Sequence, residues 1–87
     1  MENQIAPLSR ISIYACDVNN VLSRVLQTFS KSRFVVRYIE IFDTEDADVK
    51  LIIVEASFPE ELIPLIINRI EKIIEVHRAF LHRDEDI

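Results

Sequence analysis

Apolar and polar residues alternate near the start of the chain, and the period then lengthens. Between residues 11 and 16 every second residue is apolar, which is the pattern of a half-buried strand: Ile11, Ile13, Ala15. From Asn19 apolar residues recur every three or four positions and would share one face of a helix: Val21, Leu22, Val25, Leu26, Phe29. The pattern therefore predicts a strand that is followed at once by a helix.

Two further strands are predicted in the middle of the chain. Residues 34–42 and 49–57 are rich in β-branched and aromatic residues, a composition that fits a pleated sheet. The segment between them, DTEDAD, is polar and acidic, so the two strands are expected to form a hairpin with a loop longer than minimal. We expect the carboxylates of this loop to be solvated.

A second helix is predicted after the hairpin. Helical spacing returns in an apolar series: Leu62, Ile63, Ile66, Ile67, Ile70, Ile73. Ser57 and Glu60 have the spacing of a capping box at the start of this helix. Pro64 removes one amide from the second turn, so either the first turn is irregular or the regular helix begins late.

The last strand completes a recognisable order of elements. Residues 73–82 alternate again, with Val76 expected on the side of Phe80. The order strand, helix, strand, strand, helix, strand indicates an α+β, ferredoxin-like fold, in which a four-stranded antiparallel sheet carries both helices on one face. We expect three segments: an extension at residues 1–8, one domain at residues 9–82 and an acidic tail at residues 83–87.

The second face of that sheet needs a cover. In the first of the two middle strands, Ile39 and Ile41 are expected opposite Val36, so both sides are apolar. In the second, Leu51 and Ile53 alternate with further apolar residues. A sheet that is apolar on both faces is usually covered on both, whereas the two helices cover only one. We infer that another chain covers part of the open face or extends the sheet at an edge.

Composition and charge narrow the classes of function. The chain has 87 residues, of which 49% are hydrophobic and 29% charged, as in a packed globular domain. The formal net charge of -5 repels phosphate backbones and argues against a nucleic acid partner. Cys16 is the single cysteine, so no internal disulfide forms, and no apolar run approaches bilayer length. We expect a cytoplasmic protein with no membrane partner.

Three strings of the sequence resemble one family. The segments VLSRVLQTFSKSRFVVRYIEI, VKLIIVEA and EELIPLIINRIEKIIEV are similar to the first helix with the second strand, the third strand and the second helix of ACT-domain small subunits of acetohydroxyacid synthase, also called acetolactate synthase. The phrase NRIEKIIEV is the most specific, because it resembles the family's Gln-Leu-x-Lys-Leu-x-Asp-Val at five positions: Ile70, Lys72, Ile73, Glu75, Val76. The resemblance covers residues 11–81 and is closest in length to the short form of the subunit.

The resemblance implies a non-catalytic, allosteric protein without a cofactor of its own. Members of the family pair through their sheets as homodimers and bind a large thiamine-diphosphate-dependent subunit of branched-chain amino-acid biosynthesis, which they activate. Many also carry feedback inhibition by valine. Four residues of the middle strands are the candidates for the pairing surface: Ile39, Ile41, Leu51, Ile53.

The family's effector loop reads Asn-x-x-Gly-Val-Leu or Asn-x-x-Gly-Ala-Leu, and six residues stand at its positions here: Asp17, Val18, Asn19, Asn20, Val21, Leu22. A glycine lets helix-start amides approach an amino-acid carboxylate, because no Cβ intervenes. Asn20 replaces that glycine, and Asp17 adds a negative charge where the family has asparagine. We expect weak or absent valine binding. The competing interpretation is a plain helix start, with Asp17 or Asn19 as the N-cap and with Val21 and Leu22 in the core.

Other candidate chemistry is sparse. His77 and His82 have no cysteine or carboxylate at ligand spacing, so we expect surface histidines and no metal site, and Cys16 is expected to be a small core residue. Four basic residues could form a docking patch, although a solvated surface is the commoner role: Arg24, Lys31, Arg33, Arg37.

Three other classes share this fold. An acylphosphatase-like enzyme needs a glycine-containing loop with an arginine after the first strand, and this chain has Asp17 and no glycine. An RNA-recognition domain needs exposed aromatics on two strands, of which only Tyr14 is available. A stand-alone ACT dimer that senses an amino acid is the remaining alternative, since it shares every feature except the catalytic partner.

Overall fold

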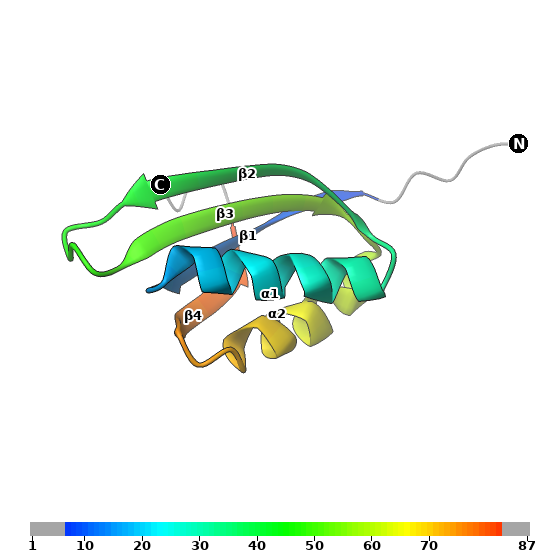
Figure 1. Ribbon diagram of the computed structural model, residues 1–87. Helices are drawn as coiled ribbons and strands as arrows, with labels where there is room; N and C mark the ends of the chain where they lie inside the picture. Colours follow the sequence, from blue (N-terminus) through cyan, green and yellow to red (C-terminus); the bar gives the residue numbers. More distant parts are fainter. Residues whose placement is uncertain (1–6, 83–87) are drawn as a thin grey trace, which may run out of the picture.

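The protein is described by a computed structural model over residues 7–82, and seven elements follow one another along the chain (Figure 1). They are β1 (Leu8–Ala15), α1 (Val18–Lys31), β2 (Val35–Asp43), β3 (Lys50–Ser57), the short 3-10 helix η1 (Glu60–Leu62), α2 (Ile63–Glu71) and β4 (Val76–Leu81). The order βαββαβ confirms the predicted ferredoxin-like fold. Residues 1–6 of the expected extension and the expected acidic tail at residues 83–87 lie outside the described residues.

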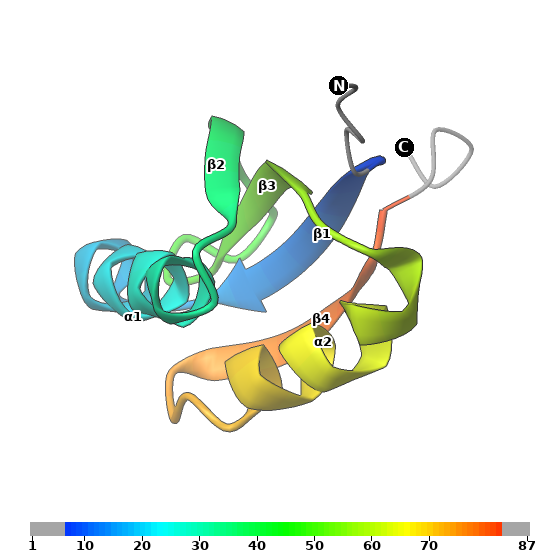
Figure 2. The same cartoon turned by 90° about the vertical axis from the view of Figure 1, so that its right-hand side faces the viewer.

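The sheet has four antiparallel strands in the order β2-β3-β1-β4, and both helices lie on one of its faces (Figure 2). We call this the helix face, and we call the other the open face. The alternation in β1 explains the core, because Ile11, Ile13 and Ala15 point to the helix face and are completely buried. They pack with apolar residues of β3 and of both helices: Ile52, Val54, Ala56, Val21, Val25, Phe29, Ile66, Ile70.

Helix α1 is flanked by two residues with left-handed backbone conformations. Asp17 before it has φ 50°, and Arg33 after it has φ 63°, although neither is a glycine. At the C-terminal end the amide of Arg33 donates to the carbonyl of Ser30 at 2.9 Å, and that of Phe34 donates to Phe29 at 3.0 Å. These two bonds form a Schellman motif, which satisfies carbonyls that the helix leaves without partners. A chain without glycine thus turns sharply at both ends of α1.

Helix α2 begins late, as Pro64 allows. The segment after β3 first makes the 3-10 turn η1, and α2 starts at Ile63 with Pro64 in its first turn, where a missing amide costs little. The predicted capping box is wrong, because the N-cap positions are Pro59 for η1 and Leu62 for α2, and neither makes a side-chain cap hydrogen bond.

Two register shifts change which side chains share a face. One lies between Val36 and Tyr38 in β2, so Val36 packs against the core on the same side as Ile39 and not opposite it. The other lies between Tyr14 and Ala15 in β1, opposite the start of β4. Val76 is therefore buried on the helix face, and its expected place beside Phe80 is wrong. A bulge adds one residue to a strand, and strict alternation cannot cross it.

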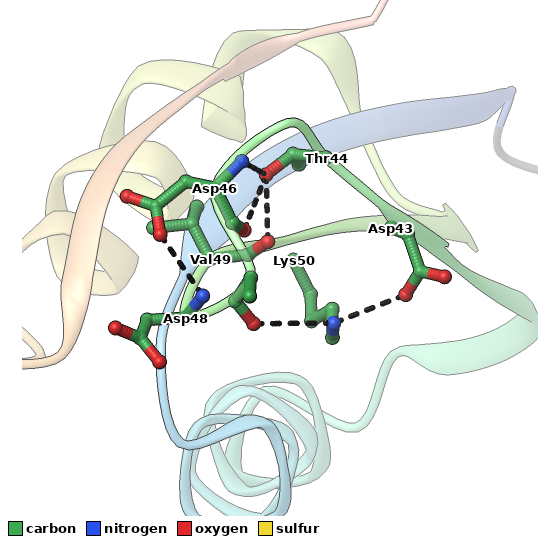
Figure 3. A network of polar contacts seen from close by, with 7 residues as sticks. Asp43, Thr44, Asp46, Asp48, Val49 and Lys50 are labelled. Atoms are coloured by element: carbon green, nitrogen blue, oxygen red, sulfur yellow. Dashed lines mark hydrogen bonds and ion pairs between the residues drawn. The ribbon is translucent and has the colours of Figure 1, made fainter.

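The hairpin loop between β2 and β3 is held by its own side chains (Figure 3). Lys50 Nζ lies 3.0 Å from Asp43 Oδ1, and the amide of Asp48 donates to Asp46 Oδ1 at 2.9 Å. The hydroxyl Oγ1 of Thr44 lies 2.8 Å from the carbonyl oxygen of Val49 and accepts a bond from the Asp46 amide at 3.1 Å. The acidic residues of this loop are thus partly structural, beyond the solvation expected for them.

Candidate functional site

The connection between β1 and α1 is a tight turn at the N-terminal end of the helix. The amide of Cys16 donates to the carbonyl of Glu75 at 3.1 Å, which ties the end of β1 to the segment before β4. Asp17 then turns the chain through its left-handed conformation, and its carbonyl accepts the first helical bond from Val21 at 3.1 Å. Asp17 stands at the N-cap position, but its carboxylate makes no cap hydrogen bond.

The six residues of the predicted effector loop divide between core and surface. Val21 is completely buried, and Val18 and Leu22 pack against the core from its edge. Asp17 and Asn19 are exposed, and Asn20 is half-buried. The polar residues Asp17, Asn19 and Asn20 are therefore all at least partly accessible from solvent.

The position that needs conformational freedom is Asp17 and not Asn20. Asp17 has positive φ, and aspartate and asparagine tolerate that region better than other residues with a Cβ. Asn20 lies within α1, where a glycine is not needed for the backbone. Asn20 therefore differs from glycine here through its side chain and not through its backbone conformation. No acidic residue lies in the first turn of α1, and capping by the Asp17 side chain is absent, so the positive end of the helix dipole is not offset by a side-chain cap.

The four residues predicted for the pairing surface do not share one face. Ile39 and Ile41 pair with Val54 and Ile52 and point to the helix face, whereas Leu51 and Ile53 point to the open face. Ile41 is 45% exposed because it lies toward the hairpin end of the edge strand β2, whereas Ile53 is 5% exposed in the interior of the sheet.

Four large apolar or aromatic side chains of the edge strand β2 are exposed: Val35, Tyr38, Ile41, Phe42. Val35 is 63% exposed and Tyr38 48%, and Phe42 also remains exposed on the open face. Tyr38 donates its hydroxyl to Glu40 Oε1 at 2.9 Å, and this bond to a carboxylate raises the pKa of Tyr38 above its ordinary value. Figure 2 shows β2 at the border of the sheet, on the side of α1.

An aromatic and cationic cluster lies on the open face between β1 and β4. The rings of Tyr14 and Phe80 stack with centroids 6.1 Å apart. The guanidinium carbon of Arg78 lies 4.6 Å from the Phe80 centroid and 5.5 Å from that of Tyr14, which is the distance of cation–π contacts. The alternation of residues 76–81 predicted that Arg78 and Phe80 share a face. Their contact with Tyr14 was not predicted, because it depends on the register of β1 and β4.

His82 differs from the prediction. His77 is exposed as expected, but His82 is 9% exposed, and its Nδ1 lies 2.8 Å from Ser12 Oγ. The expectation of a surface histidine at 82 is therefore wrong, because the chain end continues past β4 and places the ring against Ser12 of β1. The sequence carried one signal for this contact, the polar residue Ser12 in the interior of a strand. A buried hydroxyl needs a hydrogen bond partner, and His82 supplies it.

Among residues 7–82 no group of three histidines, cysteines or acidic residues could hold a metal ion. Cys16 is half-buried, and its Sγ donates to the carbonyl of Glu75 at 3.7 Å. No helix within the same range is long and apolar enough to cross a membrane. The exposed basic residues Arg24, Lys31, Arg33 and Arg37 lie on α1, just after it and on β2.

Comparisons with known proteins identify the class of domain to which this fold belongs. A sequence model of the ACT domain family matches residues 17–79, which is more than half of the chain. The chain therefore belongs to the ACT domain family, whose members are regulatory, non-catalytic, amino-acid-binding modules. No curated protein sequence matches it.

Two solved structures share the fold at low sequence identity. The C-terminal domain of the MgtC protein from Mycobacterium tuberculosis has a TM-score of 0.77 at 10% identity, over 94% of this chain and 92% of that one. The ACT domain of GTP pyrophosphokinase from Chlorobium tepidum has a TM-score of 0.65 at 15% identity, over 91% of this chain and 100% of that one. At such identities the likeness concerns the fold alone.

Proposed function

We propose that this ACT domain is the regulatory and activating small subunit of an acetohydroxyacid synthase and acts in the cytoplasm on a large thiamine-diphosphate-dependent subunit. The observation that carries the proposal is the uncovered surface of β2, where Tyr38 and Ile41 are 48% and 45% exposed on opposite faces of a free edge. An edge strand with apolar side chains on both faces suits pairing with a second chain. The resemblance of NRIEKIIEV to the family's second helix supports the choice of enzyme.

Packing of that phrase is consistent with the resemblance. In the family pattern the apolar positions alternate with charged ones, and here Ile70, Ile73 and Val76 are buried whereas Lys72 is exposed. The same pattern would fit other ACT domains, so the choice of partner depends on the sequence resemblance.

The loop geometry supports a subunit that responds weakly or not at all to valine. The exposed carboxylate of Asp17 lies at the helix start and repels a ligand carboxylate. Asn20 is half-buried in the first turn and adds bulk on the side where the family has glycine. The activating role would remain, because the exposed side chains of β2 that carry the proposal are not residues of this loop.

The test combines the chain with the large subunit of an acetolactate synthase and measures acetolactate formation with and without valine. We expect a rate increase that valine does not reverse. The double variant Asp17→Asn, Asn20→Gly should gain inhibition by valine, whereas Asn19→Gly, one position away, should not. An unchanged rate on addition of the chain would exclude the subunit role. Inhibition of the wild-type complex by valine would exclude the proposal that Asp17 and Asn20 prevent valine binding.

A second pair of variants tests the surface of β2. Ile41→Glu should lower activation, because it places a charge on the proposed pairing strand. Ile74→Glu is the matched control, since Ile74 is 93% exposed and lies in the turn between α2 and β4. Equal activation by the two variants would contradict the role of β2 as the pairing surface. If the chain forms a dimer and binds an amino acid but leaves the rate unchanged, the stand-alone sensor is the correct function.

A further inference from the structure

The two border strands of the sheet differ in how their outer sides are protected. In the order β2-β3-β1-β4 the border strands are β2 and β4, and among the strands of residues 7–82 each is hydrogen-bonded to one neighbour only. The outer side of a border strand presents backbone amides and carbonyls to which a further strand can add. Both borders are therefore candidates for pairing with another chain.

The pairing with β1 shows which amides of β4 point outward. The amide of His82 donates to the carbonyl of Arg10 at 2.8 Å, so it points toward β1. Bonding alternates along an antiparallel pair, so the amide of Phe80 also points toward β1, whereas those of Ala79 and Leu81 point outward. The Ala79 amide thus lies near the middle of the outer side of β4.

This outward amide is occupied by a side chain of α2. Glu71 is the last residue of α2, and Figure 2 shows α2 beside β4. Its Oε2 accepts a hydrogen bond from the Ala79 amide at 3.1 Å, and Ala79 is the one partner of this side chain among residues 7–82. The carboxylate stands where the carbonyl of an added strand would have to lie. A second strand can bond to Ala79 only after Glu71 has left.

Strand β2 has no such protection. Within residues 7–82 the backbone amides that donate to side chains are those of Asp46, Asp48 and Ala79, and none of them lies in β2. Strand β2 is also longer, with nine residues against six in β4. Short border strands and charged side chains at a border are two ways in which proteins prevent unwanted pairing. The structure thus leaves one border open and protects the other.

The sequence of β4 is suited to pairing with a second copy of itself. VHRAFL contains three residues that are common in strands, Val76, Phe80 and Leu81. If two copies paired antiparallel about Ala79, each Arg78 would lie opposite Phe80 of the other copy. Within one chain the Arg78 guanidinium already lies 4.6 Å from the Phe80 centroid, so the same attraction would act across the two strands.

We propose that Glu71 blocks the outer side of β4 against a second copy of this chain, so that strand pairing is directed to β2. Glu71 then determines which border of the sheet pairs, although it need not touch the partner. The choice of β2 rests on the function proposed above. The blocking of β4 is a property of the chain alone and can be tested without the enzyme.

The variant Glu71→Ala tests the proposal. Alanine is the best helix former and Glu71 is exposed, so α2 should remain folded. In dilute protein the Ala79 amide should exchange with solvent about tenfold faster or more than in the wild type, because it loses a bond to a charged acceptor. In concentrated protein the variant should associate, and its Ala79 and Leu81 amides should become protected, whereas the wild type should gain no protection there. Sedimentation equilibrium measures the association, and NMR-detected hydrogen exchange locates it.

Two further variants separate the hydrogen bond from the charge. Glu71→Gln removes the charge but keeps an oxygen that can accept from the Ala79 amide, so it should not associate through β4. Glu75→Ala removes a carboxylate from the turn between α2 and β4, and it should also behave as the wild type.

Three results would overturn the proposal. The first is equal association of Glu71→Ala and Glu75→Ala, since the loss of charge would then be the cause. The second is a Glu71→Ala protein that is no more associated than the wild type, and the third is new protection in β2 and not at Ala79. Pairing through β2 would protect the amides of β2 in every variant alike, so it does not disturb the comparison. A negative result with the large subunit would leave the blocking of β4 intact, and a negative result here would leave the test of Ile41→Glu unaffected.

Discussion

The two faces of the sheet are built from the same strands but differ in what buries their side chains. On the helix face Ile11, Ile13 and Ile52 are completely covered by α1 and α2. On the open face large side chains such as Tyr38 and Phe42 remain exposed, and Arg78 lies against two aromatic rings. The helix face therefore provides most of the stability, whereas the open face and β2 are free to contact other molecules.

Ser12 and Ile53 are exceptions on the open face that show how side chains bury one another without a covering layer. Ile53 lies opposite Ser12 in the neighbouring strand, and Phe80 lies opposite Ser12 on its other side. A serine between larger neighbours loses contact with water although no helix lies above it, so its hydroxyl needs the bond to His82.

The largest expected effect comes from the helix face. Ile13→Ala should lower the free energy of unfolding by about 2–5 kcal/mol, because it leaves a cavity in a fully packed core. Denaturant unfolding measures this loss. Ile41→Ala is the matched control on β2, and we expect it to cost less than about 1 kcal/mol because Ile41 is 45% exposed. Similar losses for the two variants would show that β2 is packed as firmly as β1.

A smaller effect is expected at Ser12. Ser12→Ala should cost about 1–3 kcal/mol, since it leaves Nδ1 of the buried His82 without a partner. Replacing both residues, as Ser12→Ala with His82→Phe, should recover most of that loss, because no polar group then remains unsatisfied. Thermal or denaturant unfolding of the single and double variants measures the coupling free energy between Ser12 and His82. Ser9→Ala in the same strand should change stability by less than about 0.5 kcal/mol.

The smallest effect concerns ionisation on the open face and not stability. Glu40→Gln should lower the pKa of Tyr38 toward its ordinary value of 10.0, because the hydrogen bond to a carboxylate and its negative charge both favour the protonated phenol. The phenolate absorbance of Tyr38 can be titrated in a Tyr14→Phe background, since the chain has two tyrosines. Glu45→Gln in the hairpin loop is the control, and an equal shift in both variants would exclude the specific contact.

Periodicity was sufficient to predict the order of elements and the helix face. The apolar stripe of residues 21–29 and the alternation of Ile11, Ile13 and Ala15 are local patterns, and each follows directly from how side chains repeat in helices and strands. Pro64 likewise predicted an irregular first turn or a late start of the regular helix, and the structure has the 3-10 turn η1 before α2 begins at Ile63.

What escaped prediction depends on contacts between distant parts of the chain. The bulges that place Val76 and Val36 on the helix face arise from pairing registers that a single strand does not encode. The Ser12–His82 bond joins residues 70 positions apart. At the predicted effector loop the family resemblance proposed six positions, but the left-handed turn at Asp17 was not predicted, because it depends on how β1 ends against the segment before β4.

The position of β2 at the border of the sheet has a consequence for local folding. Among the strands of residues 7–82 it is hydrogen-bonded to β3 alone, so the amides on its outer edge should exchange with solvent faster than those of β1, which is bonded on both sides. A chain that adds a strand there would satisfy these amides and slow their exchange. Binding at this edge would then rigidify the hairpin as well as cover it, and part of the binding free energy would be used to order β2.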